Sequence, residues 1–361
     1  MTSSRQPEKT DNMNAISNPK EFPVWQGGEL RCIARSEETH DTASFVLAAE
    51  MPARFQFLPG QFVTIGVHID DSVHYRAYSI SSTPDRTDRL TLTVRRLPGG
   101  QVSNYLLDHL KAGAKVEATT PAGEFFLDEG VADDKLLMLS AGSGVTPVMS
   151  MVRWLLTRRP DADIHFIYSA RSEQDIIFRE ELISMAQRHP NFRLDLFLDN
   201  ASGGRDRHDG FLTPERLDAL VKDAAERRIY LCGNQPYMDM VEDWHQSRGL
   251  AAGRLHKESF KPNAPEADPG SGSEYQFTAP QFGKTSKIRD GQTLLEIMEP
   301  NAIPIIAACR SGVCGSCKCK VVEGEVERVS TATLTTEELA DGFVLACSTR
   351  AKSDLVVEMV F

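Results

Sequence analysis

The first hundred residues contain short apolar runs in which hydrophobic and polar positions alternate. A period of two is typical of half-buried strands, and Gly and Pro punctuate the turns between the runs. Closely spaced strands of this kind indicate an antiparallel β-barrel or sandwich over residues 28–130. The clearest runs are 30–35, 43–49, 61–69, 74–81 and 90–96.

After residue 131 the pattern changes to an alternation of apolar strands and one-sided helices. Such alternation predicts a parallel, doubly wound α/β sheet over residues 131–260. The predicted strands are 135–142, 163–170, 192–198 and 228–233, and the predicted helices are 145–159, 175–189 and 235–249.

A polar segment, "KPNAPEADPGSGSE" at 261–274, has no apolar periodicity and predicts a linker. It separates the larger N-terminal part from a C-terminal unit, 275–361, of short strands and few helices. The first 27 residues are polar, lack the apolar core of a secretory signal and predict a disordered tail.

Length and charge narrow the class of protein. A chain of 361 residues is too long to fold around one hydrophobic core, so we expect two or three domains. A net charge of −11 argues against a nucleic-acid partner. No apolar run reaches the 18 residues of a membrane span. We therefore expect a cytoplasmic protein whose seven cysteines are kept reduced and are available to a metal.

Four cysteines in the last unit have the spacing of a metal site. Cys309-x4-Cys314-x2-Cys317 is followed, after 29 intervening residues, by Cys347. This is the plant-type [2Fe–2S] pattern, in which three thiolates on one loop and a distant fourth hold two irons.

Zinc is the alternative metal for this loop, but a structural zinc ion usually requires two separated pairs of ligands or added histidines. No histidine lies between residues 257 and 361. Cys319 fits no ligand position and is expected in a strand beside the site. The unit resembles plant-type ferredoxins over its whole length, which implies a β-grasp (α+β) fold.

In the β-rich part, "RAYSISS" resembles the flavin motif of the ferredoxin–NADP reductase superfamily. Strand alternation places Arg76 and Tyr78 on one face. A guanidinium suits a pyrophosphate, and an aromatic ring can stack on the isoalloxazine. Ser79 can hydrogen-bond the flavin N5, where hydride arrives, and is a candidate catalytic residue.

"LTLTVRRLPGGQVSNYLLDHL" follows at the family's distance. Its glycines and the helix start at Gly100, Val102 and Ser103 form an anion site of backbone amides. The resemblance implies that this turn holds the pyrophosphate of FAD, which FMN lacks, and that Val94 and Arg95 lie along the flavin. It also implies a barrel-closing strand at 120–127.

"LLMLSAGSGVTPVMSM" reads as a strand, a tight turn and a helix, the context of a dinucleotide site. It lacks the third glycine of the dehydrogenase fingerprint. Gly142, Gly144 and Thr146 instead match the G-x-G-x-T-P run of the reductase superfamily, which implies NADH or NADPH as electron donor.

"YLCGNQPYM" resembles the superfamily's C-G-x-x-x-x-M motif and supplies Cys232, Gly233 and Met238. The resemblance implies that Cys232 lies beside the nicotinamide C4, as a candidate catalytic residue. The alternative is a small buried hydrophobic residue.

Ser169 and Arg171 follow a predicted strand where family members contact the adenosine ribose. Arg171 can pair with a 2′-phosphate or be merely solvated, so the choice between NADH and NADPH stays open. Phe260 is either an aromatic near the flavin or a core residue.

The order of flavin barrel, nicotinamide domain and ferredoxin most resembles the NADH reductases of hybrid cluster protein. The reductase components of Rieske-type oxygenases acting on glycine betaine, stachydrine or carnitine share it. The resemblance implies transfer of electrons from NAD(P)H through FAD and a [2Fe–2S] cluster to one of these partner proteins. A non-catalytic redox sensor or a zinc-bearing interaction module is the alternative from another class.

Overall fold

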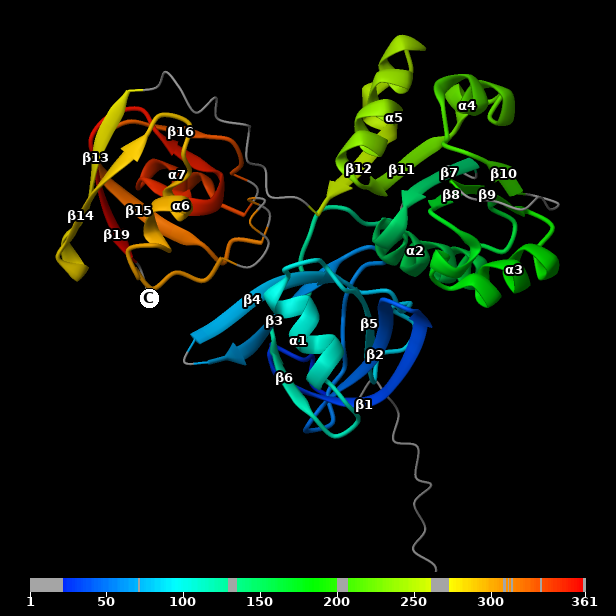
Figure 1. The fold of residues 1–361 in the computed structure, drawn as a ribbon, viewed down its shortest axis with the longest axis horizontal. Coiled ribbons are helices and arrows are strands. Elements are labelled where there is room, and N and C mark those ends of the chain that lie inside the picture. Colours follow the sequence, from blue (N-terminus) through cyan, green and yellow to red (C-terminus); the bar gives the residue numbers. More distant parts are fainter. Residues whose placement is uncertain are drawn as a thin grey trace, which may run out of the picture.

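The computed structural model describes residues 22–70, 72–128, 135–199, 207–260, 273–307, 310, 312, 314–331 and 333–359. The expectations for residues 1–21 of the tail, for linker residues 261–272 and for Cys309 fall outside this part of the chain. The end of the predicted tail, 22–27, is instead ordered on the barrel, because Trp25 is buried in its core and its amide donates to the carbonyl of Arg54 at 2.9 Å. Figure 1 shows three units in chain order, drawn in blue to cyan, in green and in yellow to red. No helix in the described ranges is long and apolar enough to cross a membrane.

The first unit is an antiparallel β-barrel. Its six strands are hydrogen-bonded in the order β4-β3-β6-β1-β2-β5, and a bridge between Ile80 and Leu92 joins the two outer strands. Alternate side chains point inward to a core that includes Phe45 and Ile65. The elements are β1 (Gly28–Thr39), β2 (Thr42–Ala49), β3 (Phe62–Ile69), β4 (Ser72–Ser79), β5 (Leu90–Arg95), α1 (Gln101–His109) and β6 (Lys115–Ala118).

One predicted barrel strand is wrong. The strand β6 that completes the sheet ends at Ala118, whereas the predicted segment, 120–127, has only one isolated bridge, from Ala122 to Phe62. Pro121 lacks a backbone N–H and Gly123 has φ of +114°, so this stretch cannot continue a regular ladder.

The second unit is a parallel sheet with helices on both faces, as predicted. Its order is β10-β9-β8-β7-β11-β12, so β7 lies between β8 and β11. The strands are β7 (Lys135–Ala141), β8 (Asp163–Ala170), β9 (Phe192–Leu198), β10 (Arg207–Asp209), β11 (Arg228–Gly233) and β12 (Leu255–Ser259). The helices are α2 (Val145–Arg158), α3 (Arg179–Arg188), α4 (Pro214–Leu220) and α5 (Gln235–Ser247).

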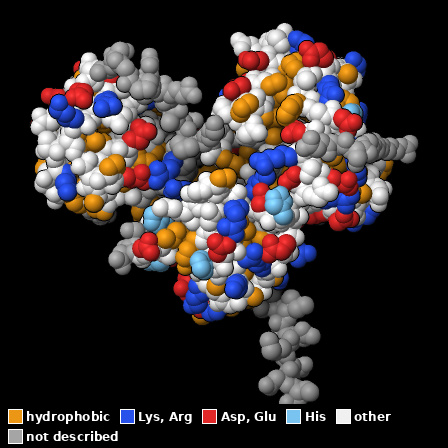
Figure 2. All heavy atoms as spheres, in the orientation of Figure 1, with side chains coloured by type: hydrophobic (Ala, Val, Ile, Leu, Met, Phe, Trp, Pro, Cys, Tyr) orange, Lys and Arg blue, Asp and Glu red, His pale blue; other side chains and the backbone are white. Residues whose placement is uncertain are grey.

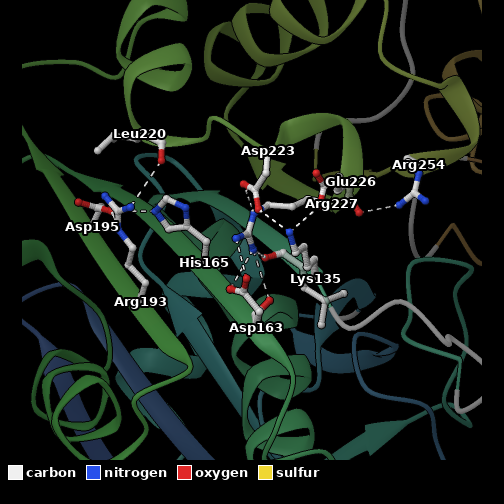
Figure 3. Close-up of polar contacts among 11 residues, drawn as sticks. Lys135, Asp163, His165, Arg193, Asp195, Leu220, Asp223, Glu226, Arg227 and Arg254 are labelled. Atoms are coloured by element: carbon white, nitrogen blue, oxygen red, sulfur yellow. Dashed lines mark hydrogen bonds and ion pairs between the residues drawn. The ribbon is translucent and has the colours of Figure 1, made fainter.

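Figure 3 shows two groups of polar side chains in this sheet, one around Arg227 and one around Asp195. Arg227 pairs with Asp163 and Asp223 at 2.8 Å and joins the starts of β8 and β11. Nearby, buried Asp195 accepts 2.7 Å hydrogen bonds from His165 and His208 and so ties β8, β9 and β10 together. Both groups lie away from the carboxyl ends of the strands, so we regard them as structural.

The third unit is a five-stranded mixed sheet, β14-β13-β19-β15-β17, with a helix packed on it, the β-grasp arrangement. A capping box at Thr293 and Glu296 starts its helix α6. The elements are β13 (Glu274–Ala279), β14 (Lys284–Arg289), α6 (Leu294–Met298), β15 (Lys318–Glu323), β16 (Val326–Arg328), α7 (Thr336–Ala340), β17 (Phe343–Leu345), β18 (Thr349–Ala351) and β19 (Leu355–Met359).

Candidate functional site

The predicted flavin strand is β4, at one side of the barrel. Ser79 is buried at its end, and Tyr78 is half-buried and packs against the barrel core, where burial raises the pKa of its phenol and keeps it neutral. Arg76 is partly buried and donates a 2.6 Å hydrogen bond to the carbonyl of Tyr75. Burial lowers the pKa of Arg76, and the positive charge of Arg310 lowers it further. An anion beside Arg76 would relieve both effects.

The predicted phosphate-binding turn lies at the start of α1, which packs against β4 and β5. Gly100 precedes the helix, and a Cβ there would lie only 2.6 Å from the Ser103 hydroxyl and 2.9 Å from Leu97. Val102 and Ser103 are buried on the first turn. Free amides at a helix start, next to the strand of Arg76, fit a pyrophosphate.

The predicted dinucleotide residues meet at the carboxyl ends of three adjacent strands. Ser140 in β7 is in register with Cys232 in β11, and Ala141 with Ser169 in β8. Open α/β sheets bind ligands at this edge, beside the point where the strand order reverses. Ser140 Oγ is buried and has no hydrogen-bond partner in the described ranges, as expected for a group that contacts a ligand, whereas the Ser169 hydroxyl lies beside that of Tyr237.

Two glycines after β7 allow a close approach between backbone segments. Gly142 has φ of +54°, a left-handed conformation. A Cβ on Gly144 would lie 2.1 Å from the carbonyl oxygen of Cys232, so only glycine fits there. The Thr146 hydroxyl donates to the carbonyl of Ser143 at 3.0 Å and closes the turn.

Cys232 is fully buried, and burial, followed by the charge of Glu258, raises the pKa of its thiol. The thiol is therefore neutral and is not a nucleophile at neutral pH. Gly233 packs against Ala141, and Met238 is buried in α5. Glu258 is in register with Cys232 across β11 and β12, a neighbour that the sequence did not reveal.

Arg95 lies between the barrel and the parallel sheet. Its Nε donates to Asp41 at 2.8 Å, and its Nη1 lies 3.2 Å from where a Cβ on Gly142 would be. The sequence resemblance implied a position along the flavin. The structure adds that the guanidinium reaches the dinucleotide turn, whose Gly142 carbonyl also accepts a 3.0 Å hydrogen bond from Tyr168.

Two further residues from the sequence occupy the outer part of this edge. Arg171 is exposed just after β8, near Asp199 at the end of β9. Phe260 follows β12 and is 47% exposed, so it is not a core residue. A separate cleft of about 1170 Å³ lies between the barrel and α3, and its lining contains none of the predicted site residues.

The cysteine site lies where the loop before β15 meets the turn after β17. Cys317 Sγ and Cys347 Sγ are 3.3 Å apart, and the backbone amide of Cys347 points to Cys317 Sγ at 3.5 Å. Cys314 lies on the same loop, with its Sγ 3.0 Å from the Ser316 hydroxyl. Within the described residues no three ligating side chains converge, and Cys309, the first of the four predicted ligands, lies outside them.

The backbone of the cysteine loop is neither helical nor extended, and it is suited to surrounding a cluster. Arg310, Gly312 and Gly315 all have positive φ, at 56°, 77° and 74°, a conformation that is found where backbone amides form an anion-binding concavity. A Cβ on Gly312 would come within 2.6 Å of the Ser348 hydroxyl. Cys319 is buried in β15, where the sequence placed it.

Comparison with known proteins gives three family matches. A 2Fe-2S iron-sulfur cluster binding domain matches residues 278–352, an oxidoreductase NAD-binding domain matches 138–243 and an oxidoreductase FAD-binding domain matches 29–127. These matches support FAD, NAD and a [2Fe–2S] cluster as cofactors.

Several relatives match over most of the chain. The chain is 36% identical to the glycine betaine monooxygenase reductase subunit of Pseudomonas aeruginosa, over 94% of this chain and 98% of that protein. It is 41% identical to NADH oxidoreductase HCR of Escherichia coli, over 84% and 89%. The structure of phthalate dioxygenase reductase superposes with a TM-score of 0.62 at 24% identity, covering 95% of this chain and all of that one, and shows the fold.

Proposed function

Because this chain belongs to the family of NAD(P)H-dependent oxidoreductases that join FAD-binding, NAD-binding and 2Fe-2S domains, we propose that it supplies single electrons to a partner redox protein. FAD takes up the two electrons of a hydride and releases them singly, and a [2Fe–2S] centre carries one at a time. The observation that best supports this is the meeting of Arg95, from the flavin barrel, with Gly142, from the dinucleotide edge.

In this proposal the chain's own residues bind and orient. Arg76 and the amides at Gly100, Val102 and Ser103 hold the flavin pyrophosphate. Tyr78 and Val94 contact the isoalloxazine, and Ser79 donates a hydrogen bond at N5. These assignments rest on their positions around β4, β5 and α1.

The pyridine nucleotide is assigned to the carboxyl edge of the parallel sheet. Gly142, Gly144 and Thr146 admit its pyrophosphate, and Ser169 and Arg171 face its ribose. Cys232, with Gly233 and Met238 behind it, packs against the nicotinamide as a neutral surface that excludes water. Arg95 adds positive charge where the two cofactor sites meet.

Four thiolates, from Cys309, Cys314, Cys317 and Cys347, are proposed to hold the cluster. The 3.3 Å approach of Cys317 Sγ, from the loop before β15, and Cys347 Sγ, from the turn after β17, supports shared ligation. A cytoplasmic location accords with this, because thiolate ligands must stay reduced.

Two acceptors are candidates. A hybrid cluster protein is favoured by the sequence resemblance and by the 41% identity to NADH oxidoreductase HCR. The oxygenase of a quaternary-ammonium monooxygenase is favoured by relatives that match over 94% of the chain. Anaerobic turnover of NADH or NADPH with each purified acceptor separates the two.

The cofactor assignment is tested on the same preparation. We expect flavin, two irons and two acid-labile sulfides per chain. Cys347→Ser should lose the iron and the transfer to protein acceptors but keep NADH–ferricyanide activity, because the flavin and nicotinamide domains have their own cores. A colourless protein with one zinc would refute the proposal and support the interaction module.

A further inference from the structure

Helix α2 of the NAD-binding domain is hydrogen-bonded directly into the flavin barrel. The hydroxyl of Ser150 donates to the backbone carbonyl of Ser82 at 2.6 Å, and Arg153 Nη1 donates to the carbonyl of Ser81. Ser150 and Ser81 are completely buried, and Ser82 is nearly so. Arg153 is partly exposed, because it lines the cleft between the barrel and α3, so the hydrogen bond of Ser150 is the one that lies away from solvent. A hydrogen bond shielded from solvent leaves little freedom to the two surfaces that it joins.

Arg153 is held from the opposite side by α3. Its guanidinium makes a two-pronged ion pair with Glu181, at 2.9 and 2.5 Å, and lies 4.7 Å over the ring of Phe178. Phe178 precedes α3 with φ of +61°, an unfavourable conformation for a bulky residue that the surrounding contacts must maintain. Arg153 thus connects α2, α3 and the barrel at one point.

These contacts lie close to both predicted cofactor sites. Ser81 lies two residues after Ser79, the last residue of the flavin strand β4, and Ser150 is one helical turn beyond Thr146 of the dinucleotide turn. Any tilt between the barrel and the sheet would therefore change the spacing of the two sites. Short, rigid connections of this kind determine whether reacting atoms reach a productive distance.

We propose that Ser150 and Arg153 are positioning residues that set the distance between the nicotinamide and the flavin during hydride transfer. The proposal rests on the proposed function of the two domains. Neither side chain needs to touch a cofactor, since both act through the main chain of Ser81 and Ser82.

The same helix supplies a matched control. Arg158 also reaches the barrel, where its Nε pairs with Asp85 at 2.7 Å, but its side chain is 61% exposed. Solvent screens such a pair, so it should not fix geometry. Val152 is fully buried in the core between α2 and the sheet and does not belong to the barrel core.

The experiment compares Ser150→Ala and Arg153→Met with Arg158→Gln and Val152→Ala in the full-length protein loaded with FAD. At saturating NADH, or NADPH if that is the donor, we expect flavin reduction to slow at least tenfold in the first two variants. Their dissociation constants for NAD⁺ should stay within threefold of the parent. Arg158→Gln should reduce its flavin within twofold of the parental rate. Val152→Ala should lower Tm, but at temperatures well below its Tm it should reduce flavin at the parental rate.

Two readouts separate positioning from simple stability. The change in the flavin absorption band on adding NAD⁺ should shrink in Ser150→Ala, and Ser150→Thr, which keeps the hydroxyl, should restore it. If Ser150→Ala and Arg153→Met lower Tm but reduce flavin at the parental rate with an unchanged band, the positioning role is refuted. A parent protein that neither NADH nor NADPH reduces would refute the proposed function instead.

Discussion

Gly144 is the position where the smallest chemical change should have the largest effect on hydride transfer. A Cβ at this residue would lie 2.1 Å from the carbonyl oxygen and 2.5 Å from the carbonyl carbon of Cys232. Contacts shorter than 3.0 Å are not found for real Cβ atoms, so Gly144→Ala must push α2 and the end of β11 apart by about 0.9 Å, the difference between 3.0 and 2.1 Å.

That displacement acts between the dinucleotide turn and Cys232, across the predicted nicotinamide site. A misplacement of about 1 Å lowers rates by about 10²-fold, which is about 2.7 kcal/mol of activation free energy. Flavin content and the dithionite-reduced spectrum of the cluster should not change, because the FAD-binding and ferredoxin cores lie elsewhere.

The assay is stopped-flow bleaching of the flavin at saturating NADH, or NADPH if that is the donor. Gly253→Ala serves as the control, because a Cβ there meets no atom within 4 Å and its φ is not positive. Circular dichroism and Tm check that both variants are folded. If Gly144→Ala reduces its flavin within threefold of the parent, the close approach of α2 and β11 has no kinetic role.

Three other perturbations test separate parts of the structure. Ser316→Ala should lower the cluster midpoint potential by about 59 mV, a tenfold change in equilibrium, because it removes a 3.0 Å hydrogen bond to Cys314 Sγ; an EPR-monitored titration with no shift would contradict this. Arg95→Gln should weaken NAD⁺ binding about tenfold, because it removes a charge-assisted contact, while FAD stays bound. An unchanged affinity for NAD⁺ by calorimetry would mean that Arg95 serves only the flavin site. Asp195→Asn should destabilise the chain to urea by about 3 kcal/mol, because it leaves His165 and His208 poorly paired; a loss below about 1 kcal/mol would be inconsistent with that network.

Asp195 also predicts a pH dependence. Burial opposes ionisation, but hydrogen bonds from His165 and His208 outweigh it and lower the pKa of Asp195 below that of the unfolded chain. The stabilisation is therefore complete above a pH of about 4 and is lost as the pH falls through the lower native pKa. Urea midpoints should fall below pH 4 more steeply in the parent protein than in Asp195→Asn.

The sequence predicted the three folds because each has a strong local signal. Period-two runs indicated the barrel, and strand–helix alternation indicated the parallel sheet. The cluster was indicated by the spacing of Cys309, Cys314, Cys317 and Cys347. Local signals failed where the backbone departs from its usual state. The helix predicted from residue 175 begins at Arg179, because Phe178 is left-handed.

Residues that act through neighbouring strands could not be predicted. Glu258 is near Cys232 only because β12 lies beside β11, and Arg95 reaches Gly142 only through the packing of two domains. Neither proximity leaves a trace in spacing along the chain. The run "VTPVMSMVRW" revealed an amphipathic helix, but its polar Ser150 and Arg153 gave no sign that they face a second domain.

Figure 2 shows Lys, Arg, Asp and Glu side chains interspersed over the face of the molecule. Beneath such a surface, the hydrogen bonds of Ser150 and Arg153 join the barrel to the parallel sheet. The ferredoxin unit has a hydrophobic core of its own, whereas the core of the parallel sheet takes in Phe125 and Leu127 from the end of the barrel unit. The protein should thus unfold as two cooperative units and not three. Differential scanning calorimetry of the holoprotein should resolve one endotherm for the fused flavin–nicotinamide body and a separate one for the ferredoxin, whatever the count of domains along the chain.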